Sequence, residues 1–265
     1  LAYKQLYTAV EIAAAGEGTD WLGLITRNGH IQEHNVNLQG GSQNTQYMVS
    51  FNYYDHKGII RNSGMKRYTM KTNIDQKFLD IFKAGMNLTL TRIDNDNTQL
   101  GDGNFENSGI IRSAIQMGPN IKAYDEETGT YPINPLLGSQ PNPYSLLNNT
   151  DKGRTDRLLG NVFVEARPLE GLVLRVNAGI DHAAINRSTY QPRTTLNGYN
   201  LNGVAYIYNT DNNQYLMEGT ATYQRTFADI HNLNLLAGVS YEKFNYDASE
   251  LGNNNFTTDA FLYNN

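Results

Sequence analysis

Residues able to catalyse a reaction or bind a metal are scattered along this 265-residue chain. Of its five histidines, only His30 and His34 lie close together in the sequence. In a strand, that spacing places the two rings about 13 Å apart on one face, too far for both to bind one ion. The chain has no cysteine, which excludes thiolate sites and disulfides, and it carries no recognisable nucleophile elbow or catalytic carboxylate pair. We therefore expect no enzyme activity, no cofactor and no metal centre.

An acidic, asparagine-rich run is the one candidate for calcium binding. Residues 94–97 read Asp-Asn-Asp-Asn and are followed by Asp102 and Glu106. Their oxygen atoms are of the kind that calcium prefers. The run lacks the glycine and the terminal glutamate positions of an EF-hand loop. We interpret it as a solvated loop.

Aromatic side chains that lie among Asn, Gln and Asp are the more informative group. Aromatic faces stack on sugar rings or peptide side chains, while neighbouring amides bond hydroxyl or backbone groups. Such a mixture suits capture of a polar oligomer, and the alternative is that the same rings pack the loops together. The candidate ligand-binding residues are Phe105, Tyr124, Tyr131, Asn142, Tyr144, Tyr190, Tyr199 and Tyr206.

The elements that would position these residues are strands. From Gly29 onward apolar and polar residues alternate, which is typical of strands with one apolar and one polar face. The clearest stretch is 172–182, and the other predicted strands are 31–39, 45–53, 66–76, 83–92, 157–166, 214–226 and 232–242. Before them, residues 1–28 are predicted to hold a short amphipathic helix, broken at Gly16, and a connection to the first strand.

Short and long connections alternate between the predicted strands. The short ones are 40–44, 77–81, 167–171 and 227–231, and the long ones are 54–65, 93–154, 185–213 and 246–265. Outer-membrane barrels have this asymmetry, because their periplasmic turns are tight and their extracellular loops are long. Strands of about ten residues also match the 9–11 residues that cross a bilayer at a tilt. Alternation alone would fit a soluble sandwich equally well, so the loop asymmetry is what favours a transmembrane antiparallel β-barrel.

The two faces of such a barrel would have different surroundings. The apolar set faces lipid, and its tyrosines are predicted to form an interfacial girdle: Tyr47, Tyr53, Tyr68 and Tyr241. The polar set faces a wet lumen and includes Arg67, Lys71, Asp75, Glu218 and Glu242. A net charge of −5 with no concentrated basic face argues against a nucleic-acid partner.

The residues also resemble, in order along the chain, a known family of transporters. The segment 29–35 (Gly-His-Ile-Gln-Glu-His-Asn), with Gly40-Gly41 and Arg67-Tyr68-Thr69, resembles the early barrel of SusC-like TonB-dependent transporters. Pro119-Asn120-Ile121, Gly129-Thr130-Tyr131 and Asn142-Pro143 resemble the long extracellular loop of that family. The segments around Gly160-Asn161 and His231-Asn232-Leu233 resemble the next two hairpins of that family.

The resemblance implies a plugged barrel of about 22 strands, of which this chain would supply about eight. It implies active import of oligosaccharides or oligopeptides through the outer membrane of a Gram-negative cell. The partners implied are a SusD-like surface lipoprotein that closes the barrel from outside and TonB, which energises transport. The plug domain and the TonB-contacting segment are expected to lie outside this chain. The alternatives are a small passive barrel or adhesin, and a soluble glycan-binding β-domain.

Overall fold

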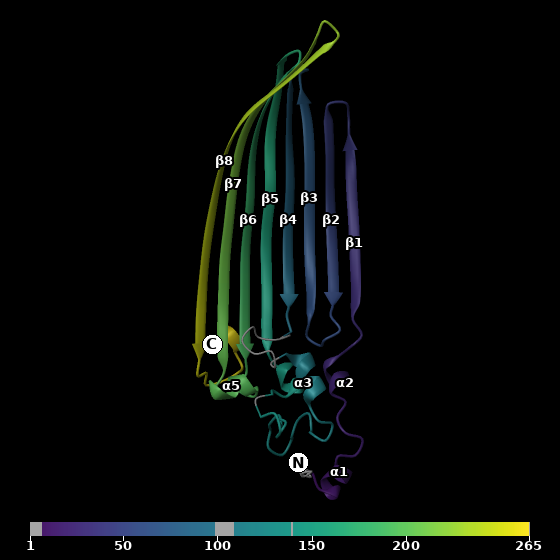
Figure 1. Cartoon of the computed structure of the whole chain (residues 1–265), viewed down its shortest axis with the longest axis vertical. Helices are drawn as coiled ribbons and strands as arrows, with labels where there is room; N and C mark the ends of the chain where they lie inside the picture. The colour runs from purple at the N-terminus through teal and green to yellow at the C-terminus, as the bar shows by residue number, and fades with distance from the viewer. Residues whose placement is uncertain (1–6, 99–108, 139, 265) are drawn as a thin grey trace.

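The computed structural model describes residues 7–98, 109–138 and 140–264. Eight strands form one antiparallel sheet in which each strand pairs with its neighbours in the sequence, as Figure 1 shows. The strands are β1 (His30–Gly41), β2 (Thr45–Lys57), β3 (Gly64–Phe78), β4 (Phe82–Asp96), β5 (Thr150–Leu169), β6 (Leu172–Gln191), β7 (Val204–Phe227) and β8 (His231–Asn254). The first and last strands do not pair with each other within the described ranges, so the sheet is an open arc. The predicted all-β, antiparallel fold class is confirmed.

Short helices occupy the connections at one end of the sheet. They are α1 (Ala9–Ala14), α2 (Trp21–Ile25), α3 (Ile110–Gln116), α4 (Pro143–Leu146), α5 (Leu196–Asn200) and the 3-10 helix η1 (Leu262–Asn264). Figure 1 shows them at the lower end, with the tight turns at the upper end. Within the described residues the predicted N-terminal helix is observed as α1, which begins at Ala9. Tyr3 and Leu6, which the prediction also included, lie outside the described residues, and the sequence does not predict α2. No helix in the described part of the chain is long and apolar enough to cross a membrane.

Three of the four tight turns contain residues in the left-handed backbone region, and the β3–β4 turn has Leu79 with φ of 55°. Ala228 and Asp229 have φ of 51° and 56° in the β7–β8 turn. Gly171, between β5 and β6, has φ of 82°. A Cβ at Gly171 would lie 2.1 Å from the carbonyl oxygen of Gln224, so glycine is required there by space as well as by conformation. These turns fix the register of the hairpins that they close.

The strands are longer than the sequence predicted. Strand lengths range from 12 residues in β1 to 24 in β7 and β8, not about ten. The sequence predicts loops at 185–191, 204–213 and 246–254, but these residues belong to β6, β7 and β8. The extensions of β6 and β8 are mostly polar on both faces, whereas the extension of β7 begins with five apolar or aromatic residues, Val204 to Tyr208, on both faces, so none of the three shows the alternation. Backbone pairing continues where the hydrophobic alternation ends, and the sequence pattern predicts only the alternating part of each strand.

The register aligns most apolar residues of the strands on one face. One row runs across Val36, Phe51, Met70, Leu90 and Leu158, which are direct partners from β1 to β5. On β4 the apolar face extends from Phe82 to Leu90, about 27 Å along the strand. At a tilt of roughly 40° this is about 21 Å of height, close to the apolar belt of about 25 Å on a transmembrane barrel. We call this surface the apolar band.

The apolar band is exposed rather than packed against a second layer. Met217, Val162 and Val176 are 57%, 51% and 51% exposed, although each lies within the sheet. A contiguous apolar surface of this extent is expected to contact lipid or another protein. A two-layer β-sandwich would bury it, and the strands of the described residues form a single sheet.

A small hydrophobic core holds the connections together at the loop end. It joins three segments far apart in the sequence, and its buried members are Trp21, Ile25, Ile60, Ile110, Ala114, Met117, Ile121 and Leu146. The Trp21 indole donates a hydrogen bond to the Gly118 carbonyl at 3.0 Å. Thr19 donates through its hydroxyl to the Ile121 carbonyl at 2.7 Å. This loop core therefore gives the long β4–β5 connection a defined shape.

Candidate functional site in the loops and on the polar face

Three of the predicted ligand-binding tyrosines gather on the β4–β5 loop. The ring centroids of Tyr124 and Tyr131 are 5.0 Å apart, and those of Tyr131 and Tyr144 are 6.2 Å apart. Tyr124 and Tyr144 are 41% and 37% exposed. The Tyr131 hydroxyl accepts a hydrogen bond from the Asn148 amide at 2.7 Å. This tyrosine trio offers ring faces on which a sugar or a peptide side chain can stack.

Asn142, predicted as a ligand contact, lies beneath the trio and is buried. It is the N-cap of α4, and its Oδ1 accepts from the backbone N–H groups of Tyr144 and Ser145. Its Nδ2 donates to the carbonyls of Ala123 and Pro132, at 3.2 and 2.8 Å. All of its donors and acceptors are used within the loop, so Asn142 supports the rings and has no group left for a ligand.

A charged carboxylate stands next to the trio in the sequence. Asp125 accepts a hydrogen bond from the backbone N–H of Glu127 at 3.0 Å. Hydrogen bonds from that N–H and from the Thr128 side chain hold the pKa of the Asp125 carboxyl below its ordinary value. The loop surface around the trio therefore combines aromatic faces with a carboxylate that stays ionised at neutral pH.

The remaining predicted tyrosines are dispersed. Tyr199, on α5, is 76% exposed, and Tyr206, on β7, stacks on Tyr208 with centroids 6.0 Å apart. Tyr190 is completely buried, with its ring 5.5 Å from that of Phe256. Phe105 lies outside the described residues. The structure thus brings three of the eight candidates together in one exposed cluster and places Tyr190 in a structural role.

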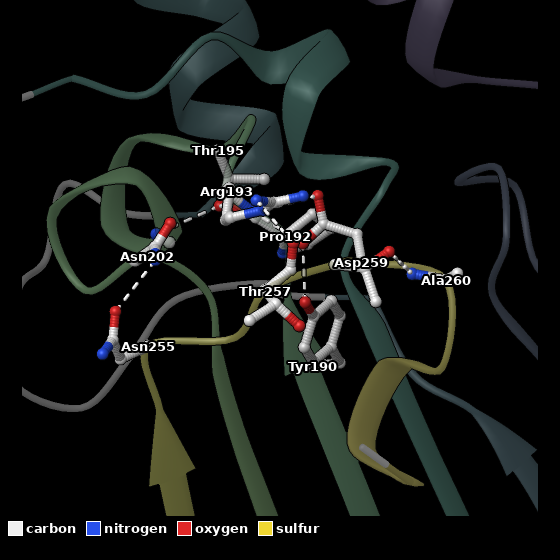
Figure 2. Close-up of polar contacts among 11 residues, drawn as sticks. Tyr190, Pro192, Arg193, Thr195, Asn202, Asn255, Thr257, Asp259 and Ala260 are labelled. Carbon is white, nitrogen blue, oxygen red and sulfur yellow. Dashed lines mark hydrogen bonds and ion pairs between the residues drawn. The ribbon is translucent and has the colours of Figure 1, made fainter.

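Tyr190, Arg193 and Asp259 form a hydrogen-bonded cluster at the loop end of β6 and β7, which we call the clasp (Figure 2). The Tyr190 hydroxyl donates to Asp259 Oδ1 at 2.6 Å, and the Arg193 guanidinium lies 3.3 Å from Asp259 Oδ2. Burial would raise the pKa of Asp259, but hydrogen bonds from Tyr190 and from Arg193, with the charge of Arg193, hold the pKa below its ordinary value. The clasp fixes the segment after β8 against the sheet.

The face opposite the apolar band carries connected polar side chains. Asn87 donates to Asn161 at 3.0 Å, Asn161 to Asn177 at 2.9 Å, and Asn177 to Glu218 at 3.2 Å. This amide ladder crosses four strands, β4 to β7. It ends on Glu218, which the sequence placed in the polar set. A face with its polar groups hydrogen-bonded to one another suits a wet lumen.

An aromatic side chain interrupts this polar face near the tight turns. Phe163 is buried there, with the Arg175 guanidinium 4.0 Å and the Lys83 ammonium 5.5 Å from its ring centroid. Lys83 also pairs with Asp75 at 3.0 Å. The sequence analysis missed both this cluster and the ladder. The alternation identified the face, but the partners depend on a strand register that spacing alone does not give.

The calcium-binding candidate of the sequence can be compared with the residues that the structure describes. No three His, Asp or Glu side chains gather there for joint coordination of an ion. In the run that suggested calcium, Asp94 pairs instead with Arg154 at 2.8 Å. Asp102 and Glu106 lie in the part of the chain that is not described.

The chain is similar in sequence to TonB-dependent receptors and in structure to a solved peptide importer. It is 30% identical over 99% of its length to TonB-dependent receptor P3 of Formosa agariphila, and covers 26% of that protein. It is 27% identical over 75% of its length to TonB-dependent receptor SusC of Bacteroides thetaiotaomicron, and covers 22% of it. The solved RagAB peptide importer in its closed-closed state superposes with a TM-score of 0.75, at 22% identity over 92% of this chain and 28% of that one. No family model matches.

The sheet, with its apolar band on one face and its polar ladder on the other, is part of the wall of a β-barrel. The relatives in sequence indicate which family of barrels this wall belongs to. The chain is part of the barrel of a SusC-like TonB-dependent transporter. It spans about a quarter of the length of the curated relatives that it matches.

Proposed function

We propose that the chain forms part of the wall of an active importer in the outer membrane of a Gram-negative cell. The observation that carries this proposal is the register, because it aligns the apolar residues of every strand in one exposed band and the polar residues on the other face. Closed into a complete barrel, such a wall pairs its backbone groups internally and presents lipid with a mainly apolar face. The relatives named TonB-dependent receptors support energised uptake over passive flow.

The loop asymmetry sets the orientation of the proposed importer. The tight turns face the periplasm, and the helices, the loop core and the tyrosine trio face the cell exterior. In this arrangement residues 1–28 and the long connections belong to the extracellular cap, and residues 29–265 otherwise form barrel wall. The expected plug and the TonB-contacting segment belong to the parent protein rather than to this wall.

The proposed cargo is an oligosaccharide or an oligopeptide. The tyrosine trio supplies stacking faces, and Asp125 supplies a charged acceptor for hydroxyl or amide groups. The structural neighbour RagAB is described as a peptide importer, which favours peptides among the two classes. The barrel wall itself performs no chemistry on the cargo.

A SusD-like lipoprotein lid is the proposed partner on the outside. Beside the trio, the same loop exposes Ile133, Leu136 and Leu137, which are 40%, 59% and 41% accessible. Apolar side chains on a loop that already has its own core are suited to burial against another protein. We assign these three aliphatic residues to the lid and the tyrosine trio to the cargo.

A small passive barrel, a soluble β-domain and an adhesin are the alternative functions, and each requires a different arrangement of the chain. A complete small barrel would require β1 to pair with β8, and the described strands leave both edges free. A soluble β-domain would have to bury the apolar band, which has no covering layer among the described residues. An adhesin would use the loops without energised uptake.

Uptake by cells that carry the full-length protein tests the proposal. Accumulation of labelled oligopeptides and oligosaccharides is compared among cells with the protein, without it, and with it but lacking TonB. Accumulation that requires both the protein and TonB supports active import. Accumulation that is independent of TonB would favour the passive barrel. Replacement of Tyr124 and Tyr144 by Ala is expected to lower uptake at least tenfold, whereas Tyr199→Ala, an isolated exposed tyrosine, leaves it within twofold.

A further inference from the structure

A large polar pocket lies on the same face of the sheet as the apolar band, directly on its loop side. Its volume is about 810 Å³. Its floor is formed by outward-facing residues of five strands, among them Lys57, Lys66 and Lys152. Arg27 forms part of its rim, where the guanidinium donates to the carbonyls of Gly58 and Ser63 at 3.0 and 2.7 Å. The pocket is therefore built from both the wall and the loop cap.

The charge of this pocket is opposite in sign to that of the whole chain. Five cationic side chains line it against three carboxylates, an excess of two positive charges in a chain of net charge −5. Arg154 is paired with Asp94 at 2.8 Å. The ammonium groups of Lys57, Lys66 and Lys152 form no ion pair with any carboxylate among the described residues. Lys66 lies opposite Asp55 and Asp94 in the register, and Lys152 lies opposite Asp96, but neither forms an ion pair there, so the excess of two positive charges remains for an anion from outside.

An apolar groove continues directly from the polar pocket. Its volume is about 790 Å³, and its outward-facing lining includes Phe51, Met70 and Leu90, with the paired Arg92 and Asp156 at its loop end. Tyr68 and Asp94 line both cavities, so the two are contiguous. At the junction the rings of Tyr53 and Tyr68 lie 5.2 Å apart, where tyrosine commonly marks the level of lipid headgroups. A cationic pocket above an apolar groove matches a molecule with an anionic head and acyl chains.

We propose that this surface binds the phosphorylated sugar headgroup of an outer-leaflet glycolipid, with its acyl chains lying along the apolar groove. Lys57, Lys66 and Lys152 neutralise the phosphates, and the amides and hydroxyls that also line the pocket bond the sugar. The inference rests on the proposed membrane placement, because only there does the junction lie at the headgroup level of the outer leaflet. It concerns the lipid side of the wall and not the transport path.

Binding of purified lipid A to the full-length protein in detergent micelles tests the site. Native mass spectrometry counts the lipid A molecules retained per barrel, with dephosphorylated lipid A as the comparison ligand. We expect Lys66→Gln combined with Lys152→Gln to weaken binding of the phosphorylated form at least tenfold. The matched control replaces Lys71 and Lys77, on the opposite face of β3, by Gln, and binding should then stay within twofold of the wild-type value.

Two results would overturn the proposal: equal retention by the wild-type protein and the Lys66/Lys152 variant, or equal binding of phosphorylated and dephosphorylated lipid A. If the glutamine variant fails to fold, Lys66→Arg with Lys152→Arg keeps the charge and must bind as the wild type does. Heat-dependent migration on gels reports barrel folding independently. A protein that forms no barrel in micelles would refute the membrane placement itself, whereas a folded barrel without lipid A would refute only this site.

Discussion

Leu88 and Thr89 are neighbours on β4 with opposite surroundings in a membrane. Leu88 lies on the apolar band opposite Thr72, and Thr89 lies on the polar face opposite Lys71. We predict that Leu88→Arg destabilises the barrel strongly and that Thr89→Arg does not. Both substitutions introduce arginine on the same strand at nearly the same depth, so a difference between them reports which face of the sheet contacts lipid.

The magnitude follows from the depth of Leu88. The band on β4 runs from Phe82 to Leu90, which places its centre at Met86. Leu88 is two residues away, about 5 Å of depth at a tilt of roughly 40°. Arginine on the lipid face costs about 2–4 kcal/mol at the midplane and less towards the interfaces. We therefore expect about 2–3 kcal/mol for Leu88→Arg, a roughly 30- to 150-fold change in the folding equilibrium.

Urea titration of the full-length protein in phosphatidylcholine vesicles measures this difference, with tryptophan fluorescence and heat-dependent gel migration as two independent signals. Thr89→Arg should change the unfolding free energy by less than about 0.5 kcal/mol. Equal destabilisation by both substitutions, or a larger effect of Thr89→Arg, would refute the assignment of the apolar face to lipid.

Three further predictions concern the turns, the ladder and the clasp. Gly171→Ala should destabilise the barrel by about 1–2 kcal/mol in the same titration, because Gly171 has φ of 82°; Gly219→Ala, whose Cβ would find its nearest atom at 3.6 Å, should be close to neutral. Asn161→Leu should cost about 1–3 kcal/mol by removing the partner of Asn87 and Asn177, and an unchanged midpoint would argue against the ladder. The lowered pKa of Asp259 stabilises the clasp above the ordinary value of 3.8, and that stability is lost as pH falls through the lowered pKa. Hydrogen exchange in residues 255–264 should therefore accelerate below about pH 4, and Asp259→Asn should exchange fast at neutral pH as well.

The sequence predicted the parts of the fold that depend on local pattern. The alternation in 172–182 located β6 and identified which of its faces is apolar, because side-chain direction in a strand depends only on position. It did not reveal that β6 continues to Gln191, since the alternation is lost after Ile185, where residues 186–189 are polar on both faces. Pairing with β7, and not hydrophobicity, extends the strand there.

The candidate site was predictable in kind but not in arrangement. Tyr124, Tyr131 and Tyr144 could be selected as loop aromatics, and the structure adds that they touch one another. Tyr190 looked equivalent in the sequence but is buried, because Asp259 folds back onto it from 69 residues away. The loop core was not predictable either, since Trp21, Ile60 and Ile110 come from three separate segments. Contacts between distant segments carry no local signal.

The central claim is that the two faces of the sheet meet lipid and water respectively, and spin labels along β6 test it most directly. The chain has no cysteine, so within it a single cysteine introduced at each position from Leu174 to Asp181 carries one nitroxide label in the reconstituted full-length protein. We predict that collision with oxygen, which concentrates in lipid, is high at Leu174, Val176 and Ala178, and that collision with a water-soluble nickel complex is high at Arg175 and Asn177. Accessibility without a period of two, or with the two faces exchanged, would contradict the account.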